Sequence, residues 1–282
     1  MPENIIIPNP GRLNGLKDNI SDGGSEGFHV LADFDGTLIK AFVNGKEVPS
    51  MLSVLRDEGY LTPDYPEKAK ALFNKYHAIE IDPDIPKGEK KKAMLEWWTK
   101  HFELLIRSGL NKKDIEKAIT SSRIQLREGT REFLAFLAER NIPLVVMSSS
   151  GLGGNAIQMF LEKEECFYQN IYIISNSFEW DEKGRAVALK EPIIHGMNKS
   201  ETIVQGFPFF EKIKDKRNVL LIGDSLSDVG MIKGFEYDNL IKVGFLNSNT
   251  EEDLERYKEV FDIVIARDGD TSFVNNILKE LF

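Results

Sequence analysis

Six short, almost continuously apolar runs recur along this chain, and segments of helical periodicity lie between them. Strands that are covered on both faces have this composition, and they occur in parallel sheets whose strands are joined by crossover helices. The alternation therefore predicts an α/β fold with a doubly wound, Rossmann-like and mostly parallel sheet. The expected strands are residues 28–34, 143–147, 171–174, 218–222, 240–243 and 262–266.

One interval breaks this alternation after the first expected strand. Roughly 85 residues separate Lys40 from the helix expected near Gly129, which is too many for an ordinary crossover. Helical periodicity recurs within the interval, at residues 66–76, 87–107 and 111–126. We therefore predict a helical cap domain at 41–123, inserted into a Rossmann-like core that consists of residues 1–40 and 124–282.

Two smaller features are expected outside these elements. Turn-forming residues between strand-like flanks predict a β-hairpin at 178–189. Residues 1–25 contain prolines and a Gly- and Ser-containing stretch, so we expect an irregular arm that lies on the core.

Two aspartates follow the first expected strand, in a DFDGT motif. The spacing of Asp33 and Asp35 suits a divalent cation and directs one carboxylate at an electrophile, while the next glycine allows a sharp turn. The same residues could form a simple polar turn, because Asp and Gly favour turns. The strand at 218–222 also leads into an acidic loop, with Asp224 and Asp228. Two such loops favour a functional site.

These acids define a predicted phosphoryl-transfer site, since the carboxyl ends of parallel strands meet at one edge of a sheet. Asp33 is the expected nucleophile, because a carboxylate can attack phosphorus and form an aspartyl-phosphate. Asp35 is the expected general acid and base. An all-oxygen site favours Mg²⁺. Its expected ligands are the Asp33 carboxylate, the Asp35 backbone carbonyl and Asp224, with Asp228 close by or acting through water. Asp228 could also cap a helix.

Two further groups are candidates for binding the phosphate. A loop of three serines and a glycine follows the strand at 143–147 and opens a helix, and hydroxyl and backbone N–H groups at a helix N-terminus bind phosphate. Ser148 and Ser149 are the candidate ligands in this loop. Lys199 is the best-placed cation to neutralise the phosphate and the nucleophile, although an isolated lysine is more often simply solvated.

Composition restricts the partner and the compartment. The chain has 282 residues, and 41% of them are apolar, which is enough to build a buried core. Its single cysteine, Cys166, excludes an intrachain disulfide. No stretch reaches the roughly 18 apolar residues of a membrane helix, so we expect a cytoplasmic protein. We also expect it to be a monomer or a weak dimer. The net charge of −9 argues against broad binding to nucleic acid and favours a small phosphorylated metabolite.

The DFDGT motif, the serine loop, Lys199 and the acidic loop with Asp224 and Asp228 follow one another along the chain. In this order they resemble the four motifs of the haloacid dehalogenase superfamily of phosphatases. One family within it is more similar, namely the cytosolic 5′-nucleotidase III or pyrimidine 5′-nucleotidase family, and the likeness runs from about Asn9 to the C-terminus. The segments that carry it are NGK at 44–46, IEIDP at 79–83, EWWTK at 96–100, LREG at 126–129, NIPL at 141–144, NK at 198–199 and KVGFLN at 242–247.

This resemblance implies a Mg²⁺-dependent hydrolase that converts nucleoside 5′-monophosphates to nucleoside and phosphate. It also implies a helical cap that recognises the base. Glu80 matches the family's substrate-contacting glutamate in the cap. Trp97 or Trp98 could offer an aromatic face to a base, and either could instead pack in the cap core.

The chain departs from the family pattern at three places. Gly36 stands where the family usually has Met. The serine loop is one residue longer, so that strand register favours Ser148 as the matching serine and loop register favours Ser149. Leu52 replaces a family histidine near the base and cannot make its hydrogen bond, so the base preference is not carried over.

Two other functions stay open at this point. One is a haloacid dehalogenase-type phosphatase that acts on another small phosphomonoester, such as a sugar phosphate or phosphoserine. The more remote one is a non-catalytic regulatory module that binds Mg²⁺ and phosphate. Transfer of the phosphoryl group to a nucleoside acceptor could also accompany hydrolysis, because an alcohol can intercept an aspartyl-phosphate.

Overall fold

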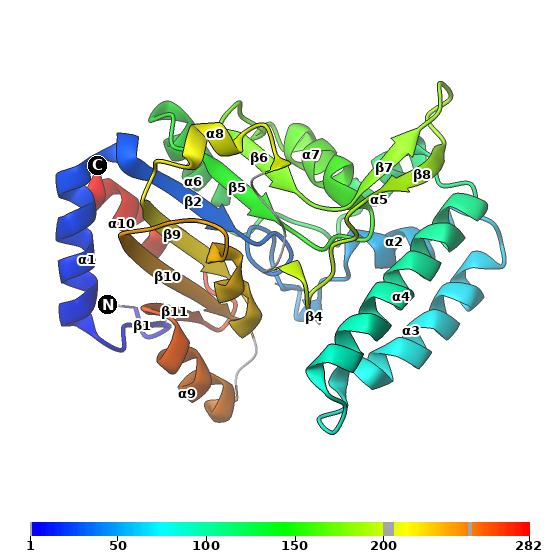
Figure 1. Cartoon of the computed structure of the whole chain (residues 1–282), viewed down its shortest axis with the longest axis horizontal. Helices are drawn as coiled ribbons and strands as arrows, with labels where there is room; N and C mark the ends of the chain where they lie inside the picture. The colour runs from blue at the N-terminus through cyan, green and yellow to red at the C-terminus, as the bar shows by residue number, and fades with distance from the viewer. Residues whose placement is uncertain (1, 200–205, 248–249) are drawn as a thin grey trace.

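A seven-stranded sheet forms the centre of the molecule, with the order β1-β11-β10-β9-β2-β5-β6 (Figure 1). This computed structural model describes residues 2–199, 206–247 and 250–282. The strands from β11 to β6 pair in parallel, and β1 alone pairs antiparallel, with β11. The strand bounds are β1 Ile5–Ile6, β2 Phe28–Ala32, β5 Leu144–Met147, β6 Ile171–Ile174, β9 Asn218–Gly223, β10 Asn239–Leu246 and β11 Ile263–Ala266. The predicted α/β class with a mostly parallel sheet is confirmed.

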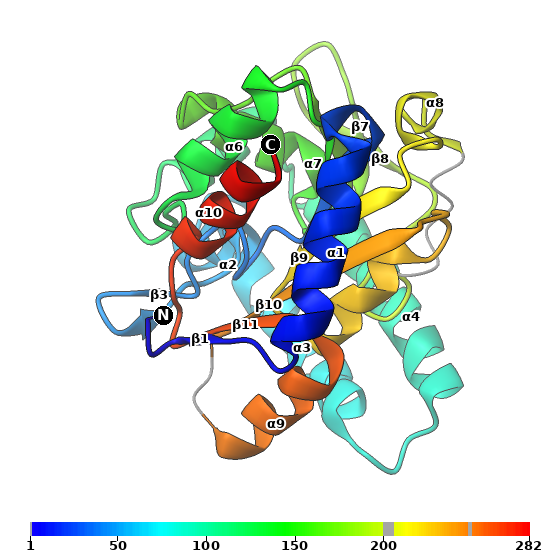
Figure 2. The same cartoon turned by 90° about the vertical axis from the view of Figure 1, so that its left-hand side faces the viewer.

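Both faces of the sheet are buried, which is why its strands are almost continuously apolar. Successive side chains of a strand point to opposite faces. In β2, Val30 and Ala32 therefore belong to one apolar cluster and Leu31 to another. Figure 2 shows three helices, α1, α10 and α6, side by side on the face to which Val30 and Ala32 point. The helices of the core are α1 Pro10–Gly23, α6 Thr130–Glu139, α7 Gly153–Lys163, α8 Phe210–Ile213, the 3₁₀ helix η4 Leu226–Ile232, α9 Glu251–Val260 and α10 Ser272–Leu281.

Four helices and a small hairpin lie between β2 and α6, where the cap is predicted. The longest two, α3 and α4, pack against each other and project beyond the carboxyl ends of the strands (Figure 1). In α4, buried residues recur every three or four positions, so one face of the helix is apolar. The bounds are β3 Phe42–Val43, β4 Lys46–Glu47, α2 Met51–Asp57, α3 Tyr65–Ile81, α4 Lys87–Arg107 and α5 Lys112–Ile119. The domain division at 41 and 123 stays a prediction.

Several expected elements are confirmed, and some of them have shifted ends. The helix at 87–107 has both predicted ends. The hairpin is confirmed as β7 (Ser177–Trp180) and β8 (Ala186–Lys190). The helix expected at 111–126 is wrong at its end, because α5 stops at Ile119. The Thr120 hydroxyl donates to the Lys117 carbonyl at 2.7 Å, and a hydroxyl that competes in this way for backbone groups weakens a helix.

The expected irregular arm at the N-terminus is wrong. Residues 5–6 form β1, and α1 follows. The Asn9 side chain caps this helix by accepting the Arg12 backbone N–H at 3.0 Å, and Pro10 occupies the first turn, where its missing N–H costs nothing. Leu13 and Ile20 are buried against the core. The Asn-Pro pair is therefore a helix start and not part of an irregular arm.

Candidate active site

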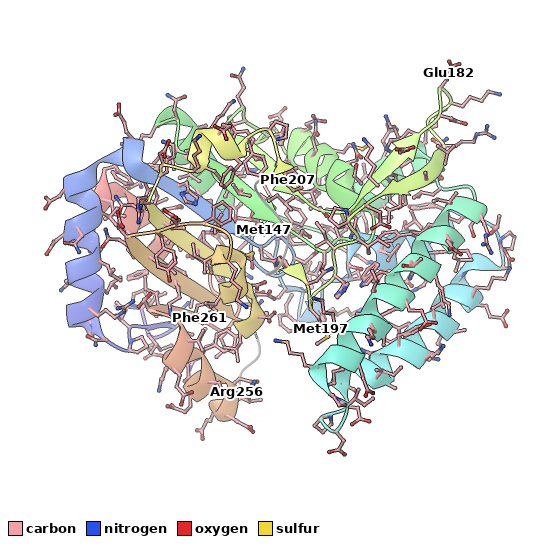
Figure 3. The ribbon with its side chains drawn as sticks, in the orientation of Figure 1. Met147, Glu182, Met197, Phe207, Arg256 and Phe261 are labelled. Atoms are coloured by element: carbon pink, nitrogen blue, oxygen red, sulfur yellow. The ribbon has the colours of Figure 1, made fainter. Side chains whose placement is uncertain are left out.

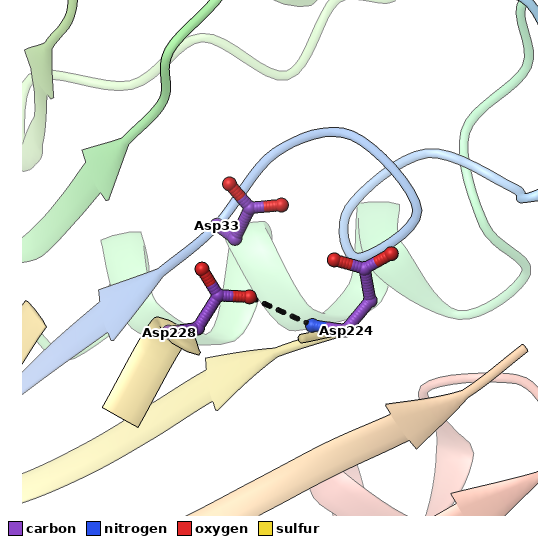
Figure 4. Close-up of side chains that lie close together, drawn as sticks. All are labelled: Asp33, Asp224 and Asp228. Atoms are coloured by element: carbon purple, nitrogen blue, oxygen red, sulfur yellow. Dashed lines mark hydrogen bonds between the residues drawn. The ribbon is translucent and has the colours of Figure 1, made fainter. Parts of the chain in front are cut away.

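Three carboxylates meet at the carboxyl edge of the sheet, as Figure 4 shows. Asp33 follows β2 and Asp224 follows β9, and these two strands are neighbours. Asp228 lies in the first turn of η4. One oxygen from each carboxylate lies within 4.8 Å of the others, and the fit of three close oxygen donors to a divalent cation is good. Strand pairing thus brings together acids that are far apart in sequence.

Asp228 caps a helix, which is one of the two roles that the sequence left open, and its role as a metal ligand stays a prediction. Its Oδ2 accepts the backbone N–H groups of Asp224 at 3.1 Å and Ser225 at 3.0 Å, which caps the start of η4. Its Oδ1 accepts a hydrogen bond from Lys199 Nζ at 2.9 Å. A Cβ on Gly223 would lie 2.5 Å from the Asp228 Cβ, so only glycine lets the strand end approach this closely.

Lys199 lies within this acidic group. Its ammonium group donates to Asp33 Oδ1 as well as to Asp228, and Lys199 is only 7% exposed. Burial alone lowers the pKa of Lys199, but the charges of Asp33 and Asp228 outweigh burial and raise the pKa above its ordinary value. The lysine is therefore a permanently charged partner of the carboxylates.

Asp33, Asp35 and Asp224 have pKa values above their ordinary range, chiefly because of burial. Burial is the main cause for Asp33, whose pKa is well above its usual range; Lys199 opposes this rise, and the neighbouring aspartates add to it. Burial and repulsion from Asp228 raise the pKa of Asp224 to about 7, and burial raises that of Asp35 to about 6. A bound cation would favour the ionised forms, so this donor set fits a divalent metal in charge as well as in arrangement.

The serine loop follows β5 and opens α7, as the sequence predicts. Ser148 is buried, and its Oγ accepts the Ser150 backbone N–H at 3.1 Å. Ser149 is half-buried and lines the same cavity as Asp35. The structure therefore brings Ser149 to the cavity wall and turns the Ser148 hydroxyl into the loop.

This cavity has a volume of about 820 Å³ and extends from Asp35 to the inserted helices. Asp35 and the serine loop lie at one end, and aromatic side chains line the wall that α3 and α4 provide. Trp98 stacks on Trp97, with 5.8 Å between the ring centroids. Trp97 is only 9% exposed and stacks on Tyr76 on its other side, so it contributes to the packing of the helices as well as to the cavity. Leu52 also lines this space.

Glu80 does not line this cavity. Its carboxylate lies 3.3 Å from His77 Nδ1, and it borders a separate cavity of about 580 Å³ together with Met197 and Lys233. The structure thus brings Trp97 and Trp98 to the space beside Asp35 and leaves Glu80 outside it. The role of Glu80 stays a prediction.

Sequence reasoning missed the residues that connect the loops of the site. The Asn176 side chain donates to the Ser150 carbonyl at 3.2 Å and to the Ile194 carbonyl at 2.9 Å, which ties the serine loop to the segment that leads to Lys199. Arg127 and Asn247 form a second set of hydrogen bonds, since Arg127 donates to Asn247 and both side chains donate to the Gly36 carbonyl in the DFDGT turn. Both belong to segments that carry the family resemblance, but no chemical pattern in the sequence marks them.

A parallel sheet with carboxylates and a lysine at its carboxyl edge, under inserted helices, defines a haloacid dehalogenase-type phosphatase. The model of the pyrimidine 5′-nucleotidase (UMPH-1) family matches residues 36–282. The chain belongs to this family, and it is an enzyme of the 5′-nucleotidase class.

Two comparisons over the whole chain agree with this membership. The human 7-methylguanosine phosphate-specific 5′-nucleotidase is 33% identical over 282 residues, which is 100% of this chain and 93% of the human protein. A crystal structure of cytosolic 5′-nucleotidase IIIB bound to cytidine has a TM-score of 0.89 and 27% identity, and the match covers 99% of this chain and 94% of that one.

A more distant structure shares only the fold. A substrate-bound phosphoserine phosphatase has a TM-score of 0.52 and 22% identity, and the match covers 89% of this chain and 96% of that one. Among the residues that the structure describes, no helix is both long and apolar enough to cross a bilayer.

Proposed function

We propose that this protein hydrolyses nucleoside 5′-monophosphates to nucleoside and phosphate through an aspartyl-phosphate on Asp33. The observation that carries the proposal is the group of Asp33, Asp224, Asp228 and Lys199 at the sheet edge, beside a cavity with an aromatic wall. The names of the full-length relatives support the nucleotide as substrate.

Asp33 and Asp35 divide the chemistry in this proposal. A carboxylate oxygen of Asp33 bonds to phosphorus, the bond from phosphorus to the 5′ oxygen breaks, and Asp35 gives that oxygen a proton. A water molecule then attacks phosphorus and loses a proton to Asp35. The bond between Asp33 and phosphorus breaks, which releases phosphate and restores both carboxyl groups. The raised pKa of Asp35, about 6, suits a group that both gives and takes a proton.

Lys199 and the serine loop hold the reacting groups. The ammonium group orients Asp33 through their hydrogen bond and offsets the negative charge that gathers as the phosphoryl group is transferred. Ser149 or Ser148 and the backbone N–H groups that open α7 are the proposed donors to the phosphate oxygens.

The proposed cofactor is Mg²⁺. The carboxylates of Asp33, Asp224 and Asp228 and the backbone carbonyl of Asp35 would hold it, and when bound it would neutralise charge on the phosphate oxygens.

We place the nucleoside in the cavity of about 820 Å³, with residues 41–123 acting as the cap. Trp97 and Trp98 are the candidate faces for the base. The family is named after pyrimidines, the human relative is named after 7-methylguanosine, and Leu52 offers no hydrogen bond. The proposal therefore covers nucleoside 5′-monophosphates as a class. A cytoplasmic location is proposed from the cytosolic name of the similar crystal structure.

The test is phosphate release from a panel of substrates in the presence of Mg²⁺. The panel contains pyrimidine, purine and 7-methylguanosine 5′-monophosphates, sugar phosphates and phosphoserine. We expect the nucleotides to give the highest kcat/KM. Equal or faster hydrolysis of the sugar phosphates or of phosphoserine would contradict the proposal.

Asp33→Asn provides the matching loss of function. We expect activity to fall by at least about a thousandfold, because an amide is not a nucleophile of comparable strength. The control is Asp262→Asn, since Asp262 is also buried but lies at the amino end of β11, where it pairs with Arg12. Its variant should keep normal turnover.

A further inference from the structure

Asn247 lies directly after β10, beside the metal-binding acids, and its side-chain amide has three partners. Its Nδ2 donates to the carbonyl of Gly36 at 2.9 Å and to Asp224 Oδ2 at 3.3 Å. Its Oδ1 accepts a hydrogen bond from Arg127 Nη2 at 3.0 Å. One amide thus connects the DFDGT turn with the acid that follows β9.

Arg127 fixes the direction of this amide. Only the oxygen of an asparagine side chain can accept from a guanidinium group, so the bond from Arg127 turns Nδ2 towards Gly36 and Asp224. The arginine itself is 2% exposed, and its guanidinium group lies over the ring of Phe245, 4.2 Å from the centroid. It has little room to take another position.

The other bonds of Arg127 anchor it to two loops. Its Nε donates to the Thr37 carbonyl at 2.8 Å, Nη1 donates to Asp268 Oδ1 at 2.9 Å and to the Gly269 carbonyl at 2.6 Å, and Nη2 also donates to the Gly36 carbonyl. A planar group with five donors can make this set of bonds, and a lysine cannot. Arg127 therefore holds Asn247 and the DFDGT turn as one rigid unit.

The turn fits tightly against Asp224. Gly36 has a φ of +68°, and a Cβ at this position would lie 2.3 Å from Asp224 Oδ2 and 3.1 Å from Asn247 Nδ2. The glycine thus allows the carbonyl of residue 36, the amide of Asn247 and the carboxylate of Asp224 to meet. The family's usual Met would need these groups to move.

We propose that Asn247, oriented by Arg127, is a positioning residue that holds the Asp224 carboxylate ready for the metal. This inference rests on the Mg²⁺ site of the proposed function. A carboxylate whose rotamer is already fixed loses less conformational freedom when it binds an ion. Loss of the Asn247 amide therefore weakens metal binding by more than it weakens the fold.

The test is Mg²⁺ binding to the substrate-free enzyme by isothermal titration calorimetry. Asn247→Leu keeps the approximate size and removes the amide, and Asn247→Ala is the smaller second variant. We expect the Kd for Mg²⁺ to rise by about 10-fold to 100-fold, as for other residues that orient a metal ligand. At saturating Mg²⁺, the KM for a nucleoside monophosphate should change less than twofold.

The matched control is Asn170→Ala. Asn170 is also half-buried, and its Nδ2 donates to the Ile142 carbonyl at 2.7 Å, at the opposite edge of the sheet. Thermal unfolding in EDTA should show similar losses of stability for both asparagine positions, while only the Asn247 variants lose Mg²⁺ affinity. An unchanged Mg²⁺ Kd in a folded Asn247 variant would overturn the inference. A wild-type protein that binds Mg²⁺ but hydrolyses no nucleotide would instead overturn the proposed function and leave the inference standing.

Discussion

At the scale of single residues, the charge of Lys199 decides how two buried acids, Asp33 and Asp228, can coexist. Lys199 donates to Asp33 and Asp228, and all three are less than 10% exposed. A buried pair of this kind adds little net stability, but removing one partner leaves the others uncompensated. The lysine is therefore important for the fold of the site as well as for the proposed chemistry.

Lys199→Met tests both roles. We expect kcat to fall by about 100-fold to 1000-fold, which is the usual cost of removing one group that stabilises charge in a transition state. We also expect the free energy of unfolding in EDTA to fall by about 3–5 kcal/mol, because two carboxylates lose their counter-charge. Denaturant unfolding and steady-state kinetics measure the two effects.

The control for this variant is Lys17→Met. Lys17 pairs with Glu280 at the surface, and such exposed pairs contribute about 0–1 kcal/mol. Normal kcat in the Lys199 variant would exclude the lysine from the reaction.

His29 predicts how the fold responds to acid. It lies in β2 with no exposed surface, and burial lowers its pKa from 6.5 to about 4. Between pH 4 and pH 6.5, His29 is therefore mostly protonated in the unfolded chain and mostly neutral in the folded chain. Stability from this group is complete above pH 6.5 and falls as the pH drops towards 4, by on the order of 3 kcal/mol.

His29→Asn is the variant that separates this effect from the other acid-sensitive groups. Nδ1 of His29 lies 2.9 Å from the Lys216 carbonyl, and an asparagine amide can donate to the same oxygen without titrating. Urea unfolding at a series of pH values should give a shallower loss of stability in acid for the variant. Equal slopes for variant and wild type would contradict this assignment.

The acids were predictable from the sequence, and the residues that support them were not. Asp33 and Asp224 each follow an apolar strand, and parallel strands end at one edge, so their meeting follows from the pattern. Arg127 and Asn247 bond mainly to backbone carbonyls and to each other. Contacts of this kind depend on how loops approach in space, which no local pattern records.

At the scale of elements, the serine loop and the inserted helices meet at Gly151. This glycine follows the loop serines, and a Cβ on it would lie 2.5 Å from Leu52 Cδ2 and 2.8 Å from Trp98 Cζ3. Leu52 belongs to α2 and Trp98 to α4, so the loop of the core touches two inserted helices at one point. The absence of a side chain at Gly151 lets the helices close over the cavity.

Gly151→Ala should disturb this closure. The added methyl group must push Leu52 or Trp98 away, and overpacking of this kind costs about 1–3 kcal/mol. We expect kcat/KM for nucleoside monophosphates to fall by about tenfold, with a higher KM, because the cavity wall shifts away from the substrate.

Gly196→Ala is the control, since no atom of the described residues, its two chain neighbours aside, lies within 4 Å of the position of its Cβ. Its kinetics should stay within about twofold of the wild type, as for most surface substitutions. Unchanged kinetics of Gly151→Ala would mean that the contact plays no part in catalysis.

The elements show where sequence patterns succeed and fail. Strands that are buried on both faces, such as β5 and β9, stand out as apolar runs, and their positions are predicted to within a residue or two. The C-terminal end of α5 and the whole of α1 were not predicted, because capping and hydroxyl competition act through single side chains. The prolines near the N-terminus start a helix, although prolines more often mark a loop.

At the scale of the whole molecule, function depends on two parts of the chain that meet at one edge of the sheet. Side chains lie between these parts, as Figure 3 shows, where Met147 and Met197 are labelled. The acids and the serine loop follow strands of the sheet, and Lys199 lies in the segment that follows β8. The inserted helices supply the aromatic wall of the cavity. We infer that the first part determines the reaction and the second determines which nucleotide reacts.

The central claim is that Asp33 carries the phosphoryl group during turnover, and rapid quenching tests it most directly. Wild-type protein and Asp33→Asn are mixed with a ³²P-labelled nucleoside 5′-monophosphate and Mg²⁺ and are stopped in acid within milliseconds. We expect protein-bound label in the wild type that hydroxylamine releases, as for an acyl phosphate, and none in Asp33→Asn. Turnover without bound label, or label that survives in Asp33→Asn, would contradict the account.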